Sequence, residues 1–187
     1  RSDSLLTRCI DWSARVHDVL YAIAGNQGKG GIPIPTDNYN GVNVAFTTRR
    51  DGIFRKIDVT NLSNANGGIG GRLRGREMNL GSRGSVSIVA PGNHIALFNP
   101  NGKENKVTGT SFAAPHVTAT VALLQEYGDR RLRMGGKVPS PQASHWSLDS
   151  RHHQVMKAVL LNSADKVQDV GDGLHLGMSK TIIDKQN

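Results

Sequence analysis

Residues 109–117, Gly-Thr-Ser-Phe-Ala-Ala-Pro-His-Val, place a serine directly after a glycine and at the start of an apolar stretch that runs to Leu124. The stretch has no clear polar stripe, which predicts a helix buried in a sizeable core and ending at Gly128, a residue type common after helix C-termini. Ser111 would lie at the helix N-terminus, where free backbone N–H groups and the helix dipole favour developing negative charge. An acyl-transfer nucleophile suits this position.

The competing interpretation of Ser111 is a simple N-cap, because serine is a favoured residue at that position. Pro115 counts against it, since the proline ring crowds the carbonyl four residues back, which is that of Ser111. Backbone strain is found at functional turns and brings nothing to an ordinary capped helix. We therefore favour the nucleophile interpretation.

Residues 109–117 resemble the nucleophile motif of the subtilases, the subtilisin-like serine proteases. Ala24-Gly25-Asn26 and Val89-Ala90-Pro91-Gly92 resemble two further segments of that family. The resemblance implies that Asn26 donates its side-chain amide to the oxyanion and that Ala24 and Gly25 line the first substrate pocket. It also implies an α/β, three-layer fold with a mainly parallel sheet and a buried nucleophile helix.

The catalytic base is the part of the site that the sequence lacks. In subtilases the base belongs to a His-Gly-Thr-His context and its orienting aspartate to Asp-Thr-Gly or Asp-Ser-Gly, both upstream of Ala-Gly-Asn. None of the seven histidines stands in such a context, and His116, on the nucleophile helix, is predicted to pack in the core. Residues 1–187 are therefore expected to form a partial serine endopeptidase domain that lacks its N-terminal half and is inactive alone. The alternative is a non-catalytic binding or structural module.

The remaining elements follow from periodicity. Residues 4–17 have helical spacing, with Ser4 as N-cap and Cys9 as a buried thiol. The predicted strands are 19–24, which should be buried on both faces, 42–47, 56–59 and 85–90. Residues 93–108 are predicted to be a loop with a turn at Asn101-Gly102, and 129–147 an exposed insertion. A last helix is capped by Asp149 or Ser150 and presents one apolar face: Val155, Met156, Val159 and Leu160.

Composition bounds the partners and cofactors. The chain carries a formal net charge of +8, but its arginine- and glycine-rich segment 67–76 has no interleaved aromatic residue for base stacking, so we expect a solvated loop and no nucleic acid. No stretch reaches the length of a membrane span, and no signal peptide is recognised.

A single cysteine excludes an internal disulfide framework and a cysteine-based zinc site. His152-His153 has no third ligand at a useful spacing, so no metal is assigned from the residues. The family resemblance implies polypeptide substrates, structural calcium without recognisable ligands, and a secreted or extracytoplasmic protein.

Overall fold

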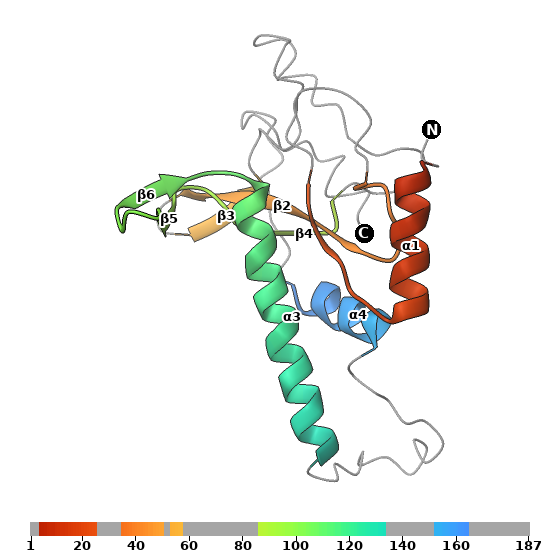
Figure 1. The fold of residues 1–187 in the computed structure, drawn as a ribbon. Helices are drawn as coiled ribbons and strands as arrows, with labels where there is room; N and C mark the ends of the chain where they lie inside the picture. The colour runs from red at the N-terminus through yellow and green to blue at the C-terminus, as the bar shows by residue number, and fades with distance from the viewer. Residues whose placement is uncertain (1–3, 26–34, 51–52, 58–85, 134–151, 165–187) are drawn as a thin grey trace.

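The structure, a computed structural model, describes residues 4–25, 35–50, 53–57, 86–133 and 152–164. Along these residues one helix is followed by six strands and then by two helices, in an α/β arrangement (Figure 1). The elements are α1 (Leu5–His17), β1 (Ala22–Ala24), β2 (Val42–Arg50), β3 (Ile53–Ile57), β4 (Ile88–Pro91), β5 (Ile95–Phe98), β6 (Glu104–Val107), α3 (Thr110–Arg133) and α4 (His153–Ser163).

The main sheet is mainly parallel, as predicted, and β2 is its central strand. β1 and β4 pair with β2 in parallel, with Ala22 opposite Val42 and Ile88 opposite Val44. β3 pairs antiparallel with the far end of β2. β3 starts three residues before the predicted strand 56–59, so a strand is present there but its predicted bounds are wrong.

One face of β2 supplies the centre of the core. Alternate residues of a strand point to the same side, and Val42, Val44 and Phe46 are all buried there. They pack with Ala113, Val117 and Val121 of α3 and with Met156 and Leu160 of α4. The strand after Ala-Gly-Asn and the helix that carries Ser111 are thus joined by one apolar cluster.

α3 differs from its prediction in burial and length. Its core face is covered, but Leu123 is 67% exposed and Tyr127 63% exposed, so the helix is not buried on all sides. It also runs through Gly128 to Arg133, which shows that Gly128 does not end it. Ion pairs between Glu126 and Arg130 and between Asp129 and Arg133 support this extension. Five residues of the predicted insertion 129–147 are therefore helical, and the others lie outside the described residues.

The loop predicted over 93–108 contains a β-hairpin. β5 and β6 pair antiparallel, with Ile95 opposite Val107. The turn predicted at Asn101-Gly102 is confirmed, and Gly102 has a φ of 73°, which favours glycine. Strands of four residues with little alternation of polarity give a weak sequence signal, which explains why the hairpin was not predicted.

α1 and β1 agree with their predictions in part. Ser4 is confirmed as the N-cap of α1, since its Oγ accepts a hydrogen bond from the Thr7 N–H at 3.1 Å. Cys9 is exposed, because it lies on the outward face of α1. β1 is shorter than predicted and only partly buried. Among the described strands, only β2 pairs with it.

The start of α4 also differs from its prediction. The helix begins at His153 with His152 in the N-cap position, so Asp149 and Ser150 are not its caps. Met156 and Leu160 are buried as predicted, whereas Val159 is 43% exposed. A cap from elsewhere in the chain replaces the expected one, because the carboxylate of Asp18 accepts a hydrogen bond from the His153 N–H at 2.8 Å.

Candidate active site

Ser111 lies in the first turn of α3, the position predicted for a nucleophile. The helix begins at Thr110, and the Phe112 N–H donates to the Gly109 carbonyl at 3.1 Å. Gly109 has a φ of 155°, a backbone conformation that residues other than glycine rarely adopt. Thr110 is buried, whereas Ser111 is exposed. This turn thus keeps Thr110 buried and leaves Ser111 exposed to solvent.

A hydrogen bond joins the two motifs that the sequence resemblance singled out. The Thr110 Oγ1 donates to the Gly25 carbonyl at 2.8 Å. Gly25 is fixed in turn, because its N–H donates to the Val44 carbonyl at 2.8 Å at the end of the β1–β2 pairing. Thr110 precedes Ser111 and Gly25 precedes Asn26, so the bond links the residues next to the candidate nucleophile and the candidate oxyanion donor. Asn26 itself lies outside the described residues.

The substrate-pocket candidates Ala24 and Gly25 stand at the carboxyl end of β1. Ala24 is exposed and pairs with Val44. A Cβ atom on Gly25 would come within 2.9 Å of the Val44 carbonyl oxygen, so this approach of two strands requires glycine. The end of a parallel strand is a common position for binding sites in α/β proteins, which agrees with the predicted role but does not test it.

Gly92 holds the other side of the Ser111 turn. Its carbonyl accepts a hydrogen bond from the Gly109 N–H at 2.8 Å. A Cβ atom on Gly92 would lie 2.4 Å from the Phe46 Cβ, 2.8 Å from the Gly109 carbonyl oxygen and 3.1 Å from the Ala113 Cβ. The segment Ala-Pro-Gly is therefore packed against the start of α3. The β5–β6 hairpin lies between Gly92 and Gly109 in the sequence. At the base of this hairpin, the His94 N–H donates to Thr108 Oγ1 at 3.0 Å.

His116 does not pack in the core, contrary to the prediction. It is exposed, and its Nδ1 lies 2.8 Å from the Phe112 carbonyl oxygen. The core face of α3 includes Ala113 and Val117. His116 is one residue before Val117 and hence about 100° around the helix, which turns its side chain out of that face.

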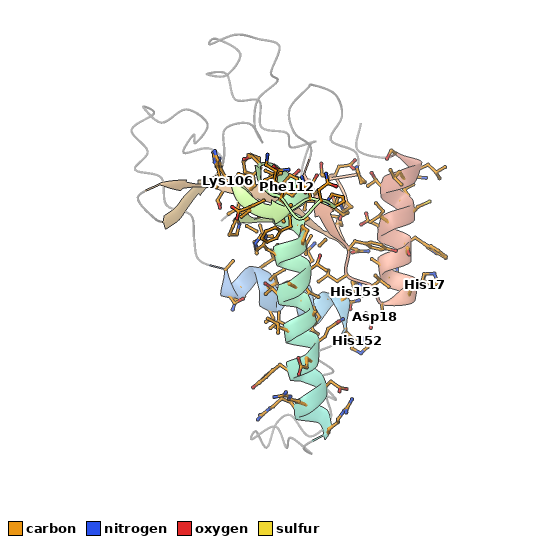
Figure 2. All side chains as sticks on the ribbon, turned by 60° about the vertical axis from the view of Figure 1, so that its left-hand side comes forward. His17, Asp18, Lys106, Phe112, His152 and His153 are labelled. Carbon is orange, nitrogen blue, oxygen red and sulfur yellow. The ribbon has the colours of Figure 1, made fainter. Side chains whose placement is uncertain are left out.

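The described histidines do not supply a base for Ser111. Within the residues that the structure describes, none of the imidazoles forms a hydrogen bond to the Ser111 side chain. His152 and His153 bond instead to Asp18 at 2.6 Å each. Figure 2 shows these three residues near the end of α1, well away from Phe112, the residue that follows Ser111. The residues that the structure describes contain no group of three or more His, Cys, Asp or Glu placed to hold a metal ion.

Comparison with known proteins decides the family. A model of the subtilase family matches residues 14–178. The chain belongs to the subtilase family. Its matched region includes all three motifs from which the resemblance was inferred, and the expected family and fold are thereby confirmed.

Individual relatives agree with this membership in sequence and in fold. The chain is 50% identical over 42 residues to the major intracellular serine protease of Bacillus subtilis (strain 168); the match covers 22% of this chain and 13% of that protein. The solved structure of the prenylagaramide maturation protease PagA matches with a TM-score of 0.56 at 22% identity, covering 99% of this chain and 56% of PagA. This subtilase therefore spans only about half of the solved structure that it resembles.

The sequence analysis did not single out two residues that the structure shows to join distant segments, Thr110 and Asp18. Thr110 was noticed only as part of the nucleophile motif, and its bond to Gly25 depends on a contact across 85 residues of sequence. Asp18 gave no signal, because an aspartate after a helix is an ordinary turn residue.

Among the described helices, none is long and apolar enough to cross a membrane.

Proposed function

We propose that this subtilase acts as a serine endopeptidase whose nucleophile is Ser111 and whose oxyanion donor is the side chain of Asn26. Family membership supports a serine peptidase with polypeptide substrates. The observation that carries the residue assignment is the hydrogen bond from Thr110 to Gly25, because it fastens the turn of Ser111 to the strand end that leads into Asn26.

The proposed reaction is acyl transfer. The Ser111 Oγ forms a bond to the carbonyl carbon of the scissile peptide while a base takes its proton. The negative charge that develops on the carbonyl oxygen is stabilised by the Asn26 amide N–H₂ and by the N–H groups at the start of α3. The C–N bond then breaks as the base returns the proton to the leaving amine. Water hydrolyses the acyl-enzyme by the same steps in reverse order.

The base and its orienting aspartate are assigned to polypeptide outside these 187 residues, since the family contexts for both do not occur in this sequence. We therefore propose that residues 1–187 alone hydrolyse peptides very slowly. A serine hydroxyl without a base stays protonated and weakly nucleophilic at neutral pH. Residual catalysis from the oxyanion donors would be roughly 10³–10⁴-fold over water.

Two expectations from the family resemblance have no support among these observations. For structural calcium, the described residues contain no group of three or more His, Cys, Asp or Glu placed to hold an ion. Secretion is not supported either, because the Bacillus subtilis relative is itself named an intracellular protease.

The test is the substitution Ser111→Ala in the intact protein. We expect kcat for peptide hydrolysis to fall on the order of 10⁶-fold and labelling by a fluorophosphonate probe at residue 111 to disappear, with folding nearly unchanged. Ser163→Ala is the matched control, because its hydroxyl only bonds within α4, to the Leu160 carbonyl. Turnover of Ser111→Ala within tenfold of the unsubstituted protein would remove Ser111 from the mechanism. An intact, folded protein without labelling or turnover would favour the non-catalytic module.

A further inference from the structure

α1 is held to the domain mainly by polar contacts. Of its 13 residues only Thr7 and Ala14 are buried, while apolar side chains such as Leu5 and Trp12 face solvent. Three of the polar contacts that fasten it involve aspartate side chains, beside a bond between Ser13 and Tyr21. Thr7 Oγ1 donates to Asp37 at 2.5 Å, and Asp11 accepts from the N–H groups of Tyr39 and Asn40 at 2.8 Å each. The third contact is that of Asp18 with α4.

Asp18 holds two histidines from a segment more than 130 residues away. Its Oδ1 lies 2.6 Å from the His153 Nδ1 and also accepts from the His153 backbone N–H at 2.8 Å. Its Oδ2 lies 2.6 Å from the His152 Nδ1. Figure 2 shows the three side chains converging between the end of α1 and the start of α4. Both carboxylate oxygens are thus used by one neighbouring element.

The backbone supports the same arrangement from both sides. Asp18 is the C-cap of α1 with φ 53° and ψ 47°, a left-handed conformation that aspartate tolerates better than most residues. α4 has no side-chain cap of its own at His152. Asp18 therefore ends one helix and caps the next, where a carboxylate is favoured by the helix dipole.

We propose that Asp18, His152 and His153 form an acid-released latch, which keeps the N-terminus of α4 attached to the end of α1 while the Asp18 carboxylate is ionised. When this carboxylate takes up a proton, it loses its charge and one of its oxygens becomes a hydroxyl donor. The three hydrogen bonds then weaken together, and the two helix ends separate. Titration of the histidines alone does not open the latch, because an imidazole can donate from Nδ1 whether or not its other nitrogen carries a proton.

The other charged or titratable residues of α1 and α4 near Asp18 interact with groups other than its carboxylate. On α1, the His17 ring contacts Trp12 edge-on, and Arg15 lies in the last turn. On α4, Lys157 donates to the Tyr39 carbonyl and interacts with Asp11. Burial lowers the pKa of Lys157, and the charge of Asp11 opposes this effect. Among the described residues, only the two histidines are charged or titratable partners of the Asp18 carboxylate.

The pKa of Asp18 agrees with the geometry. It is lowered from 3.8 to about 2, first by the His153 backbone N–H, then by the His153 ring and by His152. Because the folded pKa is depressed, the stabilising contribution is complete above pH 3.8 and is lost as the pH falls through about 2. The Asp18 side chain is 42% exposed, so solvent screening reduces the full linkage effect, and we expect a change of about tenfold in the opening equilibrium.

The experiment is amide hydrogen exchange of the intact protein between pH 8 and pH 2, corrected for the intrinsic pH dependence, with peptides from α1, α4 and β2. The readout of the latch is the first turn of α4, because Asp11 and Asp37 also fasten α1. We expect constant protection of this turn from pH 8 to pH 5, and a loss of about tenfold relative to β2 between pH 4 and pH 2. Asp18→Asn keeps the shape and tolerates the left-handed backbone, so its peptides should show the low protection already at pH 7 and no further step.

Asp129→Asn is the matched control, because Asp129 forms its ion pair within α3. It should leave the step between pH 4 and pH 2 intact. Unchanged protection in Asp18→Asn would overturn the latch. So would a loss of protection in the unsubstituted protein between pH 8 and pH 5, since that would make a histidine the titrating group. This second readout needs no variant and does not depend on the folding of Asp18→Asn.

Discussion

Gly92→Ala tests whether the Ala-Pro-Gly segment positions the Ser111 turn. The added Cβ would lie 2.4 Å from the Phe46 Cβ, whereas carbon atoms in contact are normally ~3.5–4.0 Å apart. Relief therefore requires a movement of about 1 Å. Phe46 is 1% exposed and Ala113 is fully buried, so neither can give way toward solvent. The movement falls instead on the backbone that bonds to Gly109.

We expect two consequences of this movement. Overpacking in a dense core costs about 1–3 kcal/mol of unfolding free energy, and the absence of a free direction places Gly92→Ala near 3 kcal/mol. A displacement of about 1 Å at the nucleophile should lower kcat roughly 10²-fold. Urea unfolding and peptide hydrolysis by the intact protein measure the two effects.

Gly102→Ala separates the steric effect from the loss of a glycine. Nothing lies within 4 Å of a Cβ at Gly102, but its φ is +73°. It should therefore cost about 1–2 kcal/mol through backbone strain and leave kcat unchanged. If Gly92→Ala is as stable and as active as the unsubstituted protein, the packing argument for the Ser111 turn is refuted.

Two further substitutions test the parts of the site that adjoin Ser111. Asn26→Ala should lower kcat about 10²–10³-fold with little change in KM, because the amide acts mainly in the transition state; steady-state kinetics in which only KM changes would make Asn26 a binding or turn residue. Thr110→Val keeps the shape of the side chain but leaves the Gly25 carbonyl without its donor, so unfolding free energy should fall by about 1–3 kcal/mol and kcat about tenfold or more. Thr110→Ser keeps the hydroxyl and should retain both, and equal losses in the two variants would contradict a role for that bond.

The sequence predicted the local features of this fold well where the signal was local. Apolar runs and their turns located α1, β2, β4 and the start of α3, and the motifs located the segments that meet at Ser111. The start of a helix and the end of a strand depend on a few neighbouring residues, so they can be recognised without knowledge of the packing.

What packs on each face could not be predicted in the same way. His116, Cys9 and Leu123 stand in helical patterns that predict burial, and all three are exposed because the neighbouring elements cover another side of their helices. The bonds of Thr110 to Gly25 and of Asp18 to His153 join distant segments. A pairing of that kind depends on the tertiary fold, for which a single sequence holds no direct signal.

The extension of α3 beyond the core has a consequence for the dependence of this helix on ionic strength. The helix has 24 residues, or about 36 Å at 1.5 Å per residue, and in Figure 1 its C-terminal half leaves the sheet behind. There its two i,i+4 ion pairs contribute about 0.3–0.5 kcal/mol each, so that together they contribute about as much as the glycine at 128 costs inside a helix. The cost of the glycine and the contribution of the ion pairs thus nearly cancel in this part of the helix. Added salt screens the ion pairs but not the apolar contacts of Val117 and Val121. Fraying should therefore advance from Arg133 toward the core as ionic strength rises, with a loss of helical circular dichroism that leaves the Ser111 end intact.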